Sequence, residues 1–189
     1  MEAFFVSTGL VALAEIGDKT QLLSFVLAAR LRKPWAILAG ILVATAANHA
    51  LAGVAGYLLA DLIPRSVMLW LAGLAFVAFG VWTLHPDSLD DTPRLHRAGV
   101  FVTTTIAFFL AEMADKTQFA TVALAARFHT LWPVVAGTTV GMMLSNLPAV
   151  WIGEQLAQRV PMRGVRITAA VGFILMGVLT LLGPVQELL

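Results

Sequence analysis

Long apolar stretches alternate with short polar segments along the whole chain, and this pattern predicts membrane-spanning helices. A helix needs about 20 residues to cross the hydrocarbon core of a bilayer. Six stretches meet this requirement, at residues 4–28, 35–60, 66–84, 100–126, 132–157 and 165–184. The polar segments between them are predicted to be loops, of which residues 85–99 form the longest. The pattern therefore predicts an all-α integral membrane protein with six transmembrane helices.

The chain is also built from one unit that occurs twice. When the sequence is shifted by 97 residues, LAEIGDKTQ at 13–21 falls on LAEMADKTQ at 110–118 without a gap. Each copy holds three predicted spans, and because three is odd, the second copy enters the membrane from the opposite face. We therefore expect two inverted three-helix repeats, at residues 1–84 and 100–189, joined by a cytoplasmic loop at 85–99. Many secondary transporters have inverted repeats, with a substrate site near the bilayer midplane where the repeats meet.

Composition supports the membrane class and excludes several kinds of function. Hydrophobic residues make up 59% of the chain and charged residues only 12%, with a mean hydropathy of +0.87. A soluble domain carries about 25% charged residues. The net charge of +1 gives no sign of a nucleic-acid partner, and the lack of cysteine excludes disulfides and thiolate metal sites. The first apolar stretch has no basic region before it, so we expect a retained helix rather than a cleaved signal peptide.

The basic residues of the loops predict an orientation. The first, third and fifth loops together hold eight lysines and arginines, whereas the second and fourth hold only Arg65 and Arg127. The positive-inside rule places the more basic side in the cytoplasm. Both termini are then outside, and in a bacterium this multi-pass protein would lie in the inner (plasma) membrane.

Three ionisable residues lie near the middle of the first span in each copy. They are Glu15, Asp18 and Lys19, followed by Glu112, Asp115 and Lys116. A charged side chain at a helix centre costs about 2.5–3.5 kcal/mol on insertion scales, so we expect these groups to face inward and to find partners. On a continuous helix Glu15 and Asp18 share one face, and Glu15 and Lys19 have the i,i+4 spacing of an ion pair.

The charge balance of these six groups favours a divalent cation. Four carboxylates and two ammonium groups sum to −2, which one divalent ion neutralises. Oxygen ligands favour calcium, magnesium or manganese over copper or zinc. The alternative is a structural network of ion pairs. It accounts for one Glu–Lys pair in each copy, but it leaves Asp18 and Asp115 without a cation.

Further polar residues lie at the same depth. The candidates for supporting or additional ligands are Lys19, Lys116, Gln21, Gln118, Asn48 and Asn146. Amide groups within a membrane also form hydrogen bonds between helices, which is the alternative role for them. His49 has no histidine counterpart in the second copy, and three roles stay open for it: a nitrogen ligand, a proton carrier or a packed neutral side chain.

With its two motifs the chain resembles a family of small cation/proton exchangers that carry two E-x-G-D-K-[ST] signatures. This family, long catalogued as uncharacterised, includes Golgi calcium/manganese exchangers and bacterial manganese exporters. EIGDKT at 15–20 fits the signature, and EMADKT at 112–117 has Ala114 in the place of its glycine. The resemblance implies exchange of manganese or calcium for protons, with manganese export in a bacterial member. By the same resemblance the metal ligands are Glu15, Asp18, Glu112 and Asp115.

The residues lead to proton coupling by a separate route. A low-dielectric environment and neighbouring like charges both favour the protonated form of a carboxyl group. A cluster of four such groups can therefore hold either protons or a divalent cation, and rocking repeats would expose it to each side in turn. The sequence has no ATP-binding loop, so we expect neither a primary pump nor a cofactor. The expected partners are the divalent ion, protons and the lipid bilayer.

Two other functions stay open at this point. A small-solute exporter, for example of amino acids, would need an unpaired arginine at mid-membrane for anionic solutes, yet every arginine lies at the end of a span. An intramembrane enzyme would need a reactive cluster, and the chain has no HExxH motif, no histidine-rich zinc set and no serine/arginine phosphate site. We therefore expect no enzyme. The sequence does not decide between manganese and calcium, and it is compatible with a homo-oligomer.

Overall fold

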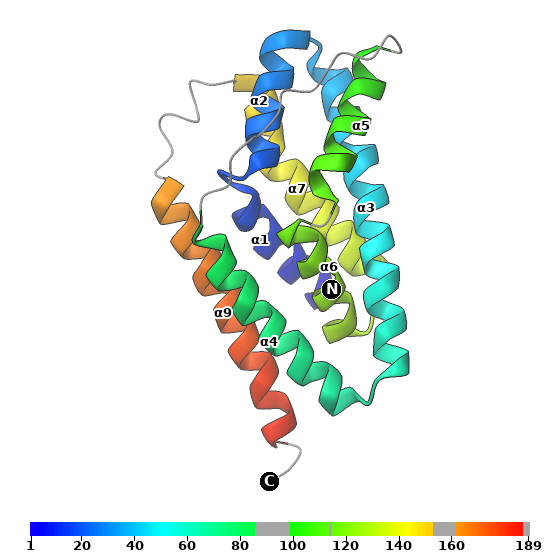
Figure 1. The fold of residues 1–189 in the computed structure, drawn as a ribbon, viewed down its shortest axis with the longest axis vertical. Helices are drawn as coiled ribbons and strands as arrows, with labels where there is room; N and C mark the ends of the chain where they lie inside the picture. Colours follow the sequence, from blue (N-terminus) through cyan, green and yellow to red (C-terminus); the bar gives the residue numbers. More distant parts are fainter. Residues whose placement is uncertain (86–98, 114, 153–161, 187–189) are drawn as a thin grey trace.

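The computed structural model describes residues 1–85, 99–113, 115–152 and 162–186. These residues form eight helices and no strand, which confirms the all-α class (Figure 1). The helices of the first copy are α1 (Glu2–Glu15), α2 (Lys19–Leu31), α3 (Pro34–Leu62) and α4 (Arg65–Thr83). Those of the second copy are α5 (Val100–Glu112), α6 (Lys116–Phe128), α7 (Trp132–Ile152) and α9 (Met162–Gln186). Most of the predicted loop at 85–99 lies outside the described residues.

The first and fourth predicted spans are not continuous helices, and this part of the prediction was wrong. In the first copy the helix stops at Glu15 and restarts at Lys19, with Gly17 at a φ of 83°, which glycine adopts without a steric penalty. In the second copy it stops at Glu112 and restarts at Lys116. The chain breaks there because Asp18 and its counterpart Asp115 take extended conformations and act as the N-cap residues of new helices.

Three helices in the described part of the chain are long and apolar enough to cross a membrane by themselves. They are α3, α4 and the segment Trp132–Trp151 of α7. Among the described residues α5 and the segment Ile167–Leu182 of α9 are shorter apolar helices. The first and fourth predicted spans do not reach the required length because each is divided into two helices of 13 or 14 residues.

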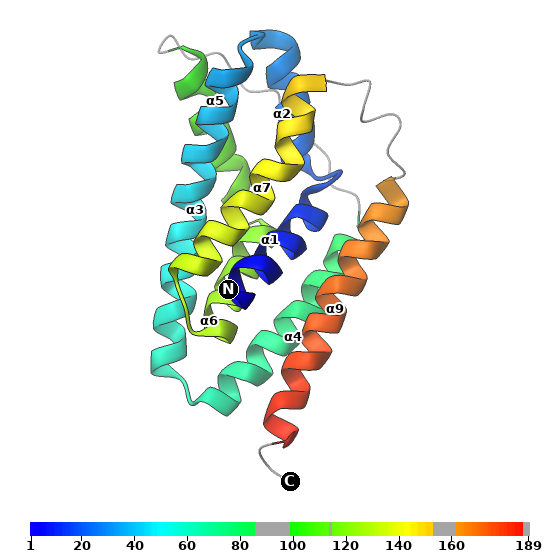
Figure 2. The same cartoon turned by 180° about the vertical axis from the view of Figure 1, so that it is seen from behind.

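The first half of each broken span packs against the second span of the other copy, which is α7 or α3. α1 lies along α7, and α5 lies along α3 (Figures 1 and 2). Two glycines at equivalent positions permit this approach. A Cβ atom on Gly40 of α3 would lie 2.7 Å from the Thr104 side chain, and one on Gly137 of α7 would lie 2.5 Å from the Phe4 carbonyl oxygen. Small residues at such crossings let membrane helices come close together.

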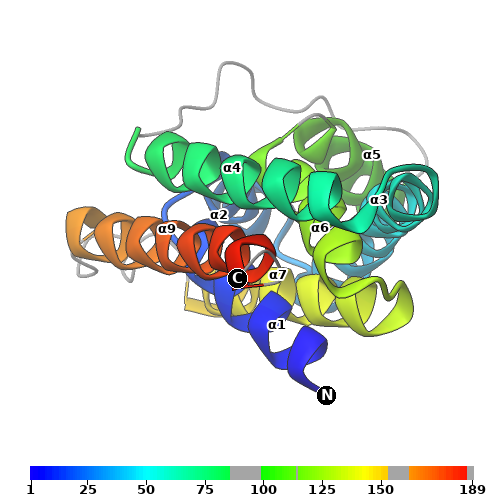
Figure 3. The ribbon, with the colours of Figure 1, turned by 90° about the horizontal axis from the view of Figure 1, so that it is seen from below.

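The two copies run in opposite directions through the bundle. In Figure 1 α3 descends and α4 ascends, whereas α7 ascends and α9 descends. The helices α4 and α9 lie side by side at one edge, as the view from below also shows (Figure 3). There the Gly177 Cα faces the Gly73 carbonyl oxygen so closely that an added Cβ would lie 2.8 Å from it.

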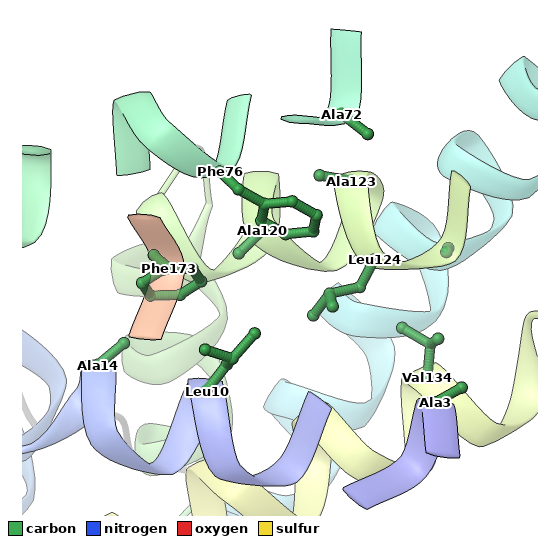
Figure 4. Close-up of a cluster of buried hydrophobic side chains, with 11 residues drawn as sticks. Ala3, Leu10, Ala14, Ala72, Phe76, Ala120, Ala123, Leu124, Val134 and Phe173 are labelled. Atoms are coloured by element: carbon green, nitrogen blue, oxygen red, sulfur yellow. The ribbon is translucent and has the colours of Figure 1, made fainter. Parts of the chain in front are cut away.

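Apolar side chains from both copies share two core clusters. The first joins α1, α4, α6, α7 and α9 and includes Leu10, Phe76, Leu124 and Phe173 (Figure 4). The second joins α2, α3, α5 and α7. Because every motif-bearing helix contributes to one of these clusters, burial of apolar surface fixes the two helix breaks relative to each other.

Candidate metal site

The two helix breaks place four carboxylates in the interior of the bundle. Glu15 and Glu112 are the last residues of α1 and α5, and Asp18 and Asp115 cap α2 and α6. Each of these four residues is at most 3% exposed. Asp18 Oδ1 accepts a hydrogen bond from the Lys19 backbone N–H at 2.8 Å, whereas Asp115 lies at the N-cap position of α6 without such a bond. The N-terminal end of a helix carries a partial positive charge, so α2 and α6 stabilise both carboxylates. Broken membrane helices commonly form ion sites in this way.

Two ion pairs cross between the copies. Lys19 Nζ lies 2.7 Å from Asp115 Oδ1, and Lys116 Nζ lies 3.0 Å from Asp18 Oδ1. The predicted pair between Glu15 and Lys19 was wrong, because the break at Asp18 puts these residues on different helices and removes the i,i+4 geometry. The expectation that an ion-pair network would leave both aspartates without a cation was wrong for the same reason.

The two glutamates are held by hydroxyl groups rather than by lysines. Thr20 Oγ1 donates a hydrogen bond to Glu15 Oε2 at 2.5 Å, and Thr117 Oγ1 donates one to Glu112 Oε2 at 3.1 Å. The second oxygen of each glutamate, Oε1, is buried and has no hydrogen-bond partner among the described residues. A buried carboxylate oxygen without a partner is costly, so these two atoms favour a bound cation or proton.

Three of the four predicted ligands converge on one point. Oxygen atoms of Glu15, Glu112 and Asp115 all lie within 4.8 Å of one another. An ion that binds two oxygens at about 2.2 Å separates them by at most about 4.4 Å, so a small contraction is enough to ligate all three. The fourth, Asp18, lies outside this group and binds Lys116. The arrangement suits a hard divalent cation held by both copies.

The predicted supporting glutamines link the copies. Gln21 Oε1 accepts from the Gly17 backbone N–H at 2.8 Å, and Gln21 Nε2 donates to the Ser145 carbonyl at 2.9 Å. At the equivalent place Gln118 Nε2 lies 3.4 Å from Asn48 Oδ1. Each glutamine thus links its motif to the second span of the other copy, α7 for Gln21 and α3 for Gln118. These contacts position the breaks, and direct ligation by the glutamines stays a prediction.

The predicted asparagines also make interhelical hydrogen bonds. Asn48 Nδ2 donates to the Phe109 carbonyl on α5 at 2.9 Å, and Asn146 Oδ1 accepts from Ser24 on α2 at 2.6 Å. Sequence reasoning did not assign roles to Thr20 and its counterpart in the second copy. The final position of the signature, which requires serine or threonine, was the signal that pointed to a hydroxyl group there.

The family comparison agrees with this geometry. A family profile described as "Divalent cation/proton antiporter GDT1" matches residues 3–91 and 100–187. The chain belongs to the GDT1 family of divalent cation/proton antiporters. GDT1 proteins are transporters and not enzymes, which confirms the expectation of a membrane transporter and decides against both the intramembrane enzyme and the small-solute exporter. The two matched blocks each contain one helix break.

Several GDT1 relatives are similar over nearly their whole length. A protein of Vibrio cholerae named "Putative manganese exporter" is 45% identical over 95% of this chain and 90% of its own length. The "GDT1-like protein sll0615" of Synechocystis is 26% identical over 95% of this chain and 97% of its own, and the "GDT1-like protein 5" of Arabidopsis thaliana is 26% identical over 98% of each. No solved structure gives a significant match to the chain.

Proposed function

We propose that this chain exports manganese from the cytoplasm in exchange for protons. The observation that carries the proposal is the buried convergence of Glu15, Glu112 and Asp115, contributed by both copies. The 45% identity to a protein named as a manganese exporter favours manganese over calcium. We propose Glu15, Asp18, Glu112 and Asp115 as the ligands that the ion meets during transport, with Lys19 and Lys116 as the groups that it displaces.

The crossed ion pairs suggest how binding and release are coupled. A divalent cation that reaches Asp115 competes with Lys19, which is held 2.7 Å from that carboxylate. Protons compete for the same oxygens, because protonation removes the charge that holds either cation. The ion and the protons therefore exclude each other from one site, which is what exchange requires.

The two copies are proposed to act as inverted repeats, residues 1–84 and 100–189, joined by the loop at 85–99. Their helices run in opposite directions, and each broken helix packs on the other copy. The rocking of one copy against the other would open the site between them to each side in turn. The ligands lie at the breaks, so a small change in the angle between two half-helices opens or closes the site.

The orientation gives a first prediction. Lys33, between α2 and α3, and Arg65, at the start of α4, are exposed at opposite ends of α3. The loop charges place Lys33 in the cytoplasm. The chain has no cysteine, so Lys33→Cys and Arg65→Cys each create a single thiol. In intact cells an impermeant thiol reagent should label Arg65→Cys and spare Lys33→Cys. The opposite pattern would reverse the proposed direction of transport.

Proton coupling is the prediction that tests the proposed function. In proteoliposomes an inward manganese gradient should acidify the outside and alkalinise the lumen, because each entering ion displaces protons. Manganese affinity should fall as the pH drops from about 8 to about 6, since protons occupy the same buried carboxylates. The measurement is lumenal pH, followed with a fluorescent dye while the membrane potential is clamped. Manganese flux without a pH change would mean a uniporter or channel and would contradict the proposal.

A further inference from the structure

His49 is a buried histidine whose ring has no hydrogen-bond partner in the part of the chain that the structure describes. It lies in the middle of α3 and is 0% exposed. Its Nε2 atom lies 3.9 Å from Glu112 Oε2, which is too long for a hydrogen bond. Among the described residues neither ring nitrogen has another partner. A buried polar group without a hydrogen bond is costly, so the position calls for a ligand that the ring can bind.

The equivalent residue of the second copy does not share this property. Asn146 accepts a hydrogen bond from Ser24 at 2.6 Å and donates one to the Met142 carbonyl at 3.0 Å. The residue that corresponds to Ser24 is Thr121, whose hydroxyl donates to the Thr117 carbonyl instead. The amide of Asn146 thus has hydrogen-bond partners, whereas the imidazole at the equivalent position, His49, has none among the described residues.

The distance between His49 and Glu112 fits two ligands of one ion. Ligands bound at about 2.2 Å are about 3.1 Å apart at a right angle and about 4.4 Å apart when they face each other. The observed 3.9 Å lies between these limits. Glu112 is itself one of the three converging carboxylates, and His49 lies outside that group, so the imidazole meets the ion on the side of Glu112.

We propose that His49 supplies one nitrogen ligand to the transported cation and thereby sets the preference of the site among divalent ions. This inference rests on the proposed function, because it takes the carboxylate cluster to be the cation site. Calcium and magnesium bind oxygen ligands almost exclusively, whereas manganese, which also prefers oxygen, accepts an imidazole nitrogen as a first-row transition ion. One imidazole beside the carboxylates therefore favours manganese over calcium and magnesium, whereas carboxylates alone do not discriminate in this way.

The test combines spectroscopy with a selectivity measurement. Manganese bound to the purified protein is examined by pulsed electron paramagnetic resonance, which detects the nuclear spin of a coordinated imidazole nitrogen. The wild-type protein should show this nitrogen coupling, and so should the control His85→Asn, which changes an exposed histidine at the end of α4. His49→Asn, which copies the residue of the second repeat, should lose the coupling. In His49→Asn the ratio of manganese to calcium affinity should fall at least 10-fold.

The wild-type spectrum tests the proposal even if a variant fails to fold, and His49→Gln provides a second, larger amide. Bound manganese without nitrogen coupling in the wild-type protein would overturn the role of His49 and leave the proposed function standing. An unchanged affinity ratio in a folded His49 variant would overturn it as well. If the wild-type protein bound no divalent cation at all, both proposals would fall together.

Discussion

Glu112→Gln should abolish cation transport, and Glu15→Gln should do the same, while both variants reach the membrane at normal levels. The amide keeps the size of each side chain and an oxygen that can accept the threonine hydrogen bond, so the fold should persist. It removes the negative charge from a fully buried residue that we propose as a ligand. Loss of one partner from a buried charged contact costs about 3–5 kcal/mol, which corresponds to about 100-fold or more in affinity. Manganese uptake into proteoliposomes measures the effect.

The matched control is Glu2→Gln, which makes the same chemical change at an exposed position in the first turn of α1. It should transport like the wild-type protein. If Glu112→Gln also transported normally, the second motif would be a structural copy, and a site shared between the repeats would have to be abandoned.

Lys116→Met should destabilise the protein by about 3–5 kcal/mol, because it leaves Asp18 as a charge buried beside an apolar side chain. The side chain of Lys116 is 5% exposed, whereas that of Lys19 is 26% exposed. Water can therefore solvate Asp115 more readily when its lysine is removed, and Lys19→Met should cost clearly less. The free energy of unfolding in mixed micelles, measured by denaturant titration, compares the two variants.

A double variant separates charge from packing. In Lys116→Met combined with Asp18→Asn, both members of the ion pair are neutral, so much of the lost stability should return. If the double variant were as unstable as Lys116→Met alone, the loss would come from packing of the lysine side chain, and the crossed ion pair would contribute little.

The apolar spans could be predicted from hydropathy, but the breaks could not. The predicted spans at 35–60 and 66–84 agree closely with α3 and α4. An uninterrupted apolar segment in lipid forms a helix because its backbone groups have no other hydrogen-bond partners there. A break of three residues disappears in an average over 20. A local signal was nevertheless present, because Asp18 followed by Gln21 has the spacing of a capping box, with glycine just before it. The second copy repeats Asp and Gln at this spacing.

The burial of the charged residues of the two motifs could be predicted, but their pairing could not. Charged residues inside apolar spans mark a functional region whatever their exact geometry. Helical periodicity relates residues only within one helix, so it could not show that Lys19 meets Asp115, which is 96 positions away. That contact depends on how the two copies pack. The prediction of a within-copy pair followed from treating a broken helix as a continuous one.

The crossed ion pairs also affect how tightly the movement of the metal ion is coupled to that of protons. Both lysines are already matched to aspartates, so when ionised the two glutamates leave the unloaded protein with an excess of two negative charges in a water-poor interior. Reorientation in that form would carry an uncompensated charge through the bilayer, at a cost of several kcal/mol per ion. The site can reorient readily from one side of the membrane to the other only after a metal ion or protons cancel the excess charge. Cycling without a bound metal ion, which would dissipate the gradient that drives the exchange, is thereby suppressed by charge balance alone.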